Sequence, residues 1–170
     1  MVRGSFVQNA NWPRLATIEH FSRDQESKLI DALAHLNSKP CREAYEKEGL
    51  RSPKTISNTR GAIVRPAEDL RNRSAADLGL SPKTYRDAQA KVNTGQAGTV
   101  FGADGRLHIF LHHTAFTGRS FLAGRLSLQE VVAHEFMHEG LDEWRSHMPG
   151  RHDLAGWDGY DRILKACQIE

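Results

Sequence analysis

The sequence predicts a small α+β domain, in which several helices come first and a short, mostly antiparallel sheet follows. Three observations lead to this class. Helix start signals recur through the first half of the chain, the hydrophobic period changes to a strand pattern on both sides of Asp104-Gly105, and a helical pattern returns after Ser127. Helices that are segregated from a small sheet are typical of the α+β class.

The first helices are predicted from capping signals. Ser22-Arg23-Asp24-Gln25 is a capping box, which predicts a helix start. The apolar face of this helix consists of Leu29, Ile30, Leu33 and Leu36. Pro40 is expected to open another short helix and Gly49 to end it, because Pro suits a first helical position and Gly suits a helix end.

The middle of the chain predicts a strand, a helix and a hairpin. Residues 61–64 have the composition of a short strand, and Ser81-Pro82 predicts the start of a helix that runs towards Val92. The apolar segments 99–101 and 107–112 flank Asp104-Gly105, which is a strong turn signal. A final short helix is expected from Asp161 to Cys167.

The size and composition predict one ordinary globular unit. With 170 residues, 39% hydrophobic and 26% charged, the chain is long enough to bury a core of its own. The net charge of +2 comes without a Lys/Arg block, so no nucleic-acid partner is expected. No apolar run approaches the about 18 residues of a membrane span, so no membrane partner is expected.

We expect residues 1–20 to form an irregular lead-in and residues 21–170 to form a single domain. The start, Met1-Val2-Arg3-Gly4-Ser5, lacks the apolar core of a signal peptide and is typical of a vector-derived remnant. Such a start is compatible with the removal of a natural leader sequence.

A metal-binding pentapeptide lies inside the last long helical pattern. Ser127-Leu128-Gln129-Glu130 is a capping box that starts this helix, and His134-Glu135-Phe136-Met137-His138 follows within it. Histidines four positions apart lie on one helix face, where both can bind one Zn²⁺ ion. Glu135 then lies beside the open position and can take a proton from a zinc-bound water. The alternative is an amphipathic helix whose two histidines have no ligand role.

A catalytic zinc usually has three protein ligands, so a third must come from elsewhere. The long metzincin pattern would need Gly at position 141 and His at position 144, where this chain has Leu141 and Trp144. A Glu ligand from a following helix is also disfavoured. The Glu residues after His138 are Glu139, Glu143 and Glu170.

His152 is the third ligand that we expect, because it follows the Pro149-Gly150 turn, where the chain can fold back towards the metal. The alternatives are Asp153, Asp158 and His147, and Asp161 is a further downstream candidate, since zinc accepts His or Asp. For the aspartates the competing roles are a helix cap or a solvated surface.

Cys41 and Cys167 are the two cysteines of the chain. Together they would close a loop of more than a hundred residues, and the alternative is two unrelated reduced thiols. If they are paired, a secreted or periplasmic location is slightly favoured.

The pentapeptide resembles that of the zincin metallopeptidases, and the later Gly150–Leu154 segment makes the chain similar to their compact minigluzincin and SprT-like types. The resemblance implies a small α+β fold in which the strand Leu107–His112 runs along the substrate cleft. The alternative role of that strand is simply an edge strand of the core sheet, and one strand can have both roles. The resemblance also implies that Tyr160 can donate to the oxyanion, the alternative being a packed aromatic. The chain lacks the zinc ribbon of SprT-like proteins. The segment 156–160 loosely resembles the aspzincin signature, whose third ligand is an Asp.

The sequence therefore predicts a zinc-dependent endopeptidase acting on a peptide or protein substrate, with His134, His138 and His152 as ligands and Glu135 as general base. The alternative from another class is a zinc-binding structural or interaction domain without turnover. A weaker third hypothesis is a protease module associated with nucleic acid.

Overall fold

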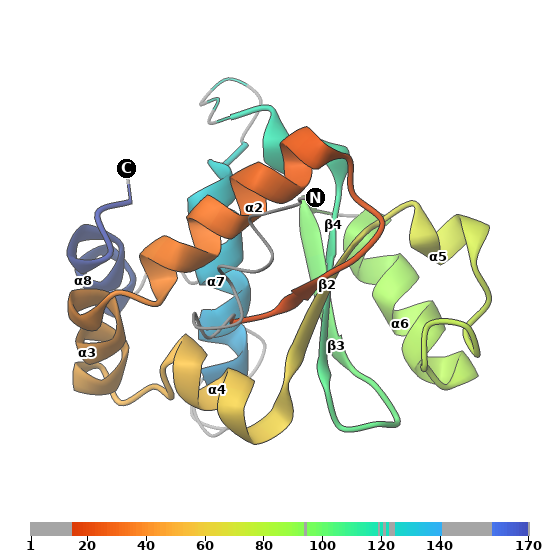
Figure 1. Ribbon diagram of the computed structural model, residues 1–170, viewed down its shortest axis with the longest axis horizontal. Coiled ribbons are helices and arrows are strands. Elements are labelled where there is room, and N and C mark those ends of the chain that lie inside the picture. The colour runs from red at the N-terminus through yellow and green to blue at the C-terminus, as the bar shows by residue number, and fades with distance from the viewer. Residues whose placement is uncertain are drawn as a thin grey trace.

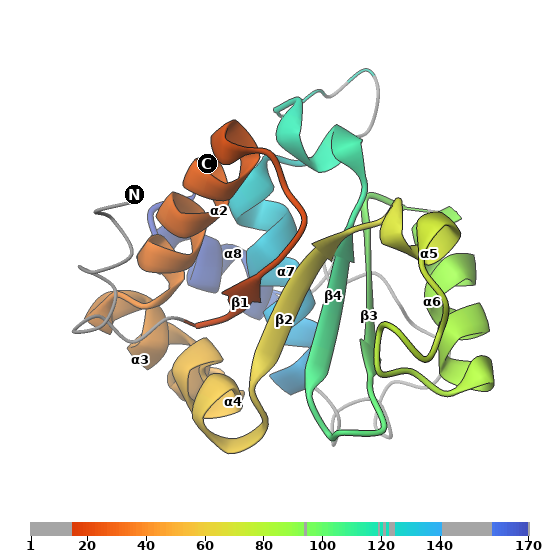
Figure 2. The same ribbon diagram turned by 45° about the vertical axis from the view of Figure 1, so that its right-hand side comes forward.

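The computed structural model describes residues 15–93, 95–118, 120, 122, 125–140 and 158–169. Over this part of the chain the fold is α+β, as the sequence predicts. Helices lie on both faces of a four-stranded sheet (Figures 1 and 2). His147, His152 and Asp153 lie outside the described residues.

The strands follow the order β1-β2-β4-β3 across the sheet. They are β1 (Thr17–Ile18), β2 (Ala62–Pro66), β3 (Ala97–Phe101) and β4 (Leu107–Leu111). The pairs β1–β2 and β2–β4 are parallel, and only β3–β4 is antiparallel. The expectation of a mostly antiparallel sheet is therefore wrong, because the crossover from β2 through two helices and β3 returns the chain parallel to β2.

The helices before the sheet begin where the capping signals predict. Helix α2 (Arg23–Leu36) has the full Ser22 capping box, and α3 (Lys39–Lys47) starts at a Ser38 cap and is followed by Gly49 with a φ of 81°. Helix α4 (Pro53–Arg60) starts at a Ser52 cap that the sequence analysis did not predict.

The remaining helices complete the two outer layers. They are α5 (Asp69–Asn72), α6 (Pro82–Asn93), the 3-10 turn η1 (His113–Phe116), α7 (Leu128–Gly140) and α8 (Asp158–Ala166). The predicted helix from Ser81 and the predicted hairpin are confirmed, and the last helix starts three residues before Asp161. Within the expected irregular lead-in, Thr17 and Ile18 form strand β1.

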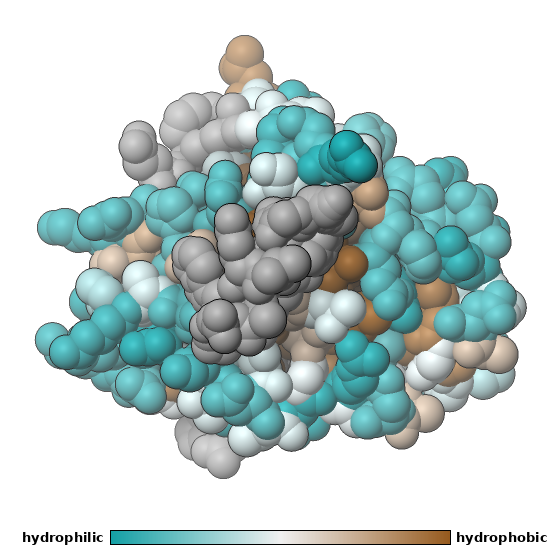
Figure 3. Space-filling model, viewed as in Figure 1, coloured by the Kyte–Doolittle hydropathy of each residue, from teal (hydrophilic) through white to brown (hydrophobic). Residues whose placement is uncertain are grey.

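The sheet separates two cores because its side chains alternate between its faces. Leu107, Ile109 and Leu111 of β4 join α2, α3, α4, α7 and α8 in the larger core. Phe110 points the other way and packs with Val100 and Ala88 against α5 and α6. Among the described residues, Leu122 is the only large apolar side chain that is exposed, and hydrophilic residues cover much of the face in Figure 3. No helix within the described ranges is both long and apolar enough to span a bilayer.

Candidate metal centre

Helix α7 carries the pentapeptide and lies against α2, α4 and β3. Its start is fixed by Ser127, whose hydroxyl accepts from the backbone N–H of Glu130 at 3.2 Å. Val132, Ala133, Phe136 and Met137 are fully buried in the larger core. Since these residues hold one side of the helix against the core, His134, Glu135 and His138 are turned towards the region beside β3.

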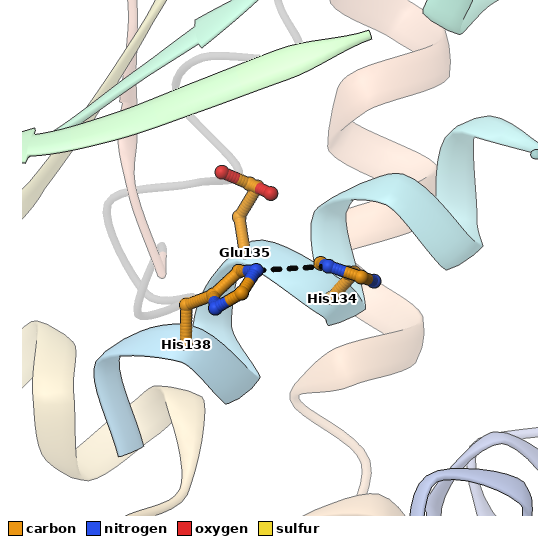
Figure 4. A group of neighbouring side chains, drawn as sticks. All are labelled: His134, Glu135 and His138. Atoms are coloured by element: carbon orange, nitrogen blue, oxygen red, sulfur yellow. Dashed lines mark hydrogen bonds between the residues drawn. The ribbon is translucent and has the colours of Figure 1, made fainter. Parts of the chain in front are cut away.

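The two histidines of the pentapeptide face each other. Their Nε2 atoms lie 2.9 Å apart, and their rings meet edge to face with centroids 4.6 Å apart (Figure 4). Two nitrogens bound to one tetrahedral zinc at about 2.0–2.1 Å would be roughly 3.3 Å apart. The side chains therefore converge as two ligands of a single ion require.

Glu135 leaves the same helix in another direction and points towards the neighbouring strand of the sheet (Figure 4). Its side chain is buried, and burial raises the pKa of its carboxyl above the ordinary value, while a hydrogen bond from Thr99 and the charge of Lys91 act in the opposite direction. Thr99 Oγ1 donates a hydrogen bond to Glu135 Oε1.

These three side chains form the group that can hold a metal ion among the described residues. One ligand atom from each of His134, Glu135 and His138 lies within 4.8 Å of the others. The donor set of two imidazoles and a carboxylate fits zinc. The prediction of a metal site at this pentapeptide is thus supported by geometry, and the identity of the metal stays a prediction.

Two of the third-ligand candidates lie on α8. Asp158 and Asp161 are exposed near its start and do not belong to the group formed by His134, Glu135 and His138. His152, Asp153 and His147 fall outside the described residues, so the expectation of a third ligand from that segment stays a prediction.

Tyr160 is buried beside His134 of the candidate metal centre. Its hydroxyl donates to Glu130 Oε2 at 2.5 Å, and its ring meets the His134 ring edge to face at 5.8 Å. The hydroxyl is therefore engaged with a carboxylate one helical turn before His134. Its predicted role at the oxyanion stays a prediction. No sequence motif marks the pairing with Glu130, although Glu130 lies four residues before His134 on the same helix face.

The disulfide between Cys41 and Cys167 is present and ties α3 to the residue after α8. Arg162 of α8 also forms a two-pronged ion pair with Glu48, with distances of 2.7 and 2.8 Å. On the same α3, the buried Tyr45 hydroxyl donates to the backbone oxygen of Ala133 at 2.8 Å. Burial raises the pKa of Tyr45, so this hydroxyl stays protonated and able to donate. The disulfide-linked pair of helices thus contacts α7 immediately before His134.

A groove with a volume of about 480 Å³ opens beside the centre. It is lined by Thr84, Asp87, Ala90, Lys91, Thr99, Val100, Phe101 and His138. Because His138 belongs to the lining, the groove reaches one of the two histidines of the candidate centre. The sequence analysis did not single out Lys91 or Thr99, since neither belongs to a motif and their positions depend on how α6 packs on β3.

The strand beside this groove is β3, so both expected roles of Leu107–His112, along the cleft and at the edge of the sheet, are wrong. Strand β4 lies between β2 and β3, and all five of its residues are buried. Such a continuously buried apolar strand is typical of a sheet interior. The partner strand of the hairpin forms the sheet edge instead.

Comparisons of the chain with models of protein families, with curated proteins and with solved structures find no match.

Proposed function

We propose that this protein is a zinc-dependent peptidase of the zincin type. The observation that carries the proposal is the convergence of His134 and His138 Nε2 beside the buried carboxylate of Glu135, next to a groove that His138 lines. Two imidazoles and an adjacent carboxylate on one helix are the donor set and the base that metal-assisted hydrolysis needs.

His134 and His138 would hold the ion, with His152 as the proposed third ligand. A zinc ion bound there would polarise a carbonyl group and lower the pKa of a water towards 7. Glu135 would accept a proton from that water and pass it to the departing amine, acting first as base and then as acid. Burial raises the pKa of Glu135 above its ordinary value, which favours the return of the proton that the carboxylate accepts.

The groove and the β3 edge support a peptide as the substrate. In an antiparallel pair, the backbone groups of alternate residues point away from the partner strand. Gln96 and Gly102 bond to His112 and Arg106 across the hairpin, so Ala97, Thr99 and Phe101 direct their backbone groups away from β4. The Thr99 carbonyl oxygen already accepts from Lys91 Nζ of α6, so an extended peptide would pair through the other outward groups of this edge, as peptide recognition by strand addition requires.

The disulfide supports a place of action outside the reducing cytoplasm. Disulfides persist in oxidising compartments. We therefore propose that the protein works as a secreted or periplasmic enzyme.

The proposed function is tested by Glu135→Gln in the zinc-loaded protein, with hydrolysis of a fluorogenic peptide library as the readout. We expect zinc stoichiometry to be retained and the cleavage rate to fall by about 10²–10⁴-fold, the usual contribution of a general acid–base group. Glu46→Gln, which removes an exposed carboxylate from α3, is the control and should cleave like the parent. A zinc-loaded parent that hydrolyses no peptide would instead favour a zinc-binding domain without turnover.

A further inference from the structure

Thr99 occupies the middle of β3 and contacts both the groove and the metal centre. Its side chain lies on the sheet face that packs against α7, on the same side as Ala97 and Phe101. Its hydroxyl donates to Glu135 Oε1. One residue of the edge strand therefore reaches the carboxylate that we propose as the base.

The backbone of Thr99 is fixed from two sides. Across the hairpin it lies opposite Ile109 of the buried strand β4, and on the outer side its carbonyl oxygen accepts from Lys91 Nζ at 2.7 Å. Because strand and helix α6 both hold this residue, its hydroxyl has a defined position. A donor on such a rigid element can orient the group that it binds.

The two oxygens of Glu135 have different surroundings. Oε1 accepts from Thr99, whereas Oε2 accepts no hydrogen bond from the described part of the chain. The ligand atoms of Glu135, His134 and His138 lie within 4.8 Å of one another. One oxygen is therefore tied to the strand, and the carboxylate keeps a second oxygen for a reacting water or amine.

We propose that Thr99 is the positioning residue of Glu135: its hydroxyl holds Oε1 at the β3 edge and so turns the other carboxylate oxygen to the reacting atoms. This inference rests on the proposed peptidase function. Thr99 acts through Glu135 and leaves zinc binding to the histidines. A small misplacement of a reacting group lowers rates by about 10²-fold, so the loss of this hydrogen bond should be visible in kcat.

The test compares Thr99→Val, which keeps the shape of the side chain and loses the hydroxyl, with Thr99→Ser, which keeps the hydroxyl. Val is well tolerated in strands, so both variants should fold. We expect Thr99→Val to lower kcat by about 10- to 100-fold with KM within about 3-fold of the parent. Thr99→Ser should stay within about 3-fold of the parent in both constants, and zinc stoichiometry should not change in either variant.

A second measurement does not depend on activity. In zinc-free protein, the fall in urea midpoint caused by Thr99→Val is measured in the parent and in a Glu135→Leu background, where the hydroxyl has no carboxylate to bind. We expect a clear fall in the parent background and a much smaller one in the other, which is the signature of a direct coupling.

The outcomes separate the two proposals. Equal kcat values for Thr99→Val and the parent, or equal losses for the Val and Ser variants, would overturn the role of the hydroxyl. A parent that hydrolyses no peptide would overturn the proposed function. In that case the midpoint comparison still decides whether Thr99 holds Glu135, and equal falls in the two backgrounds would overturn the contact.

Discussion

Histidines are buried on both faces of the sheet, and their surroundings differ. On the α5–α6 side, His108 has protein partners at both ring nitrogens: Arg65 Nη1 lies 3.1 Å from its Nδ1, and Asp104 Oδ1 lies 3.3 Å from its Nε2. On the α7 side, the Nε2 atoms of His134 and His138 face each other at 2.9 Å.

The difference separates a histidine with two structural partners from a pair that we propose as metal ligands. Arg65 can only donate, so Nδ1 of His108 accepts and its Nε2–H donates to Asp104. This ring is therefore held neutral as a link between β2 and the hairpin turn. The Nε2 atoms of His134 and His138 form a hydrogen bond with each other, and a metal ion between them would take a lone pair from each nitrogen in place of the shared proton. The groups that the ring nitrogens face, more than the burial of the ring, therefore distinguish His108 from His134 and His138.

We expect the largest effect on the free energy of unfolding from loss of the disulfide. This disulfide lies in the larger core, on the α7 side of the sheet. Its cysteines are 126 residues apart, and opening a loop of that length should lower the free energy of unfolding by about 4–5 kcal/mol. Urea unfolding of the parent and of Cys41→Ser/Cys167→Ser measures the loss. A reductant should destabilise the parent and leave the double variant unaffected. Equal stability of the two proteins would show that the cross-link contributes nothing to the α7 side.

We expect a smaller loss of stability from a substitution on the α5–α6 side of the sheet. His108→Leu removes an acceptor from the buried Arg65 guanidinium, so the free energy of unfolding should fall by about 1–3 kcal/mol. Zinc stoichiometry, measured on the same preparation, should be that of the parent. If His108→Leu lost its zinc, the division between a structural and a metal-binding face would break down.

The smallest effect that we expect is a pH dependence of the stability that His108 contributes. Burial lowers the pKa of His108 below its ordinary value of 6.5, although Asp104 acts in the opposite direction. The unfolded chain then binds the proton more readily than the folded one. The stability that neutral His108 contributes is complete above about pH 6.5 and is lost as the pH falls towards the lower, folded pKa.

Urea midpoints of the parent and of His108→Leu between about pH 8 and about pH 5 measure this effect. The advantage of the parent over the variant should shrink as the pH falls. An advantage that did not change with pH would mean that the ring is not held neutral.

The parts of the fold that the sequence predicts are those with local signals. Ser22, Pro40, Asp104-Gly105 and Ser127 mark helix starts and a turn through contacts with residues close by in the chain, and the structure confirms each of them. Strand order depends instead on packing between distant segments. The hairpin pattern therefore predicted both strands and could not decide which of them forms the edge.

The same reasoning applies to the candidate site. His134, Glu135 and His138 lie within one helical turn, so their spacing alone brings them together. Thr99 meets Glu135 across 36 positions and Tyr160 meets Glu130 across 30, and no local pattern marks either pair. Long-range contacts of this kind became visible only in the folded structure.

The central claim is that the converging nitrogens of His134 and His138 bind zinc, whereas His108 does not. The most direct test is a zinc titration of metal-free protein against a chromophoric chelator, with the parent, His138→Ala and His108→Leu side by side. We expect one zinc per chain for the parent and for His108→Leu. The affinity of His138→Ala should fall by more than the about 10- to 100-fold that the loss of an outer partner costs. Equal zinc affinity of His138→Ala and the parent would contradict the account.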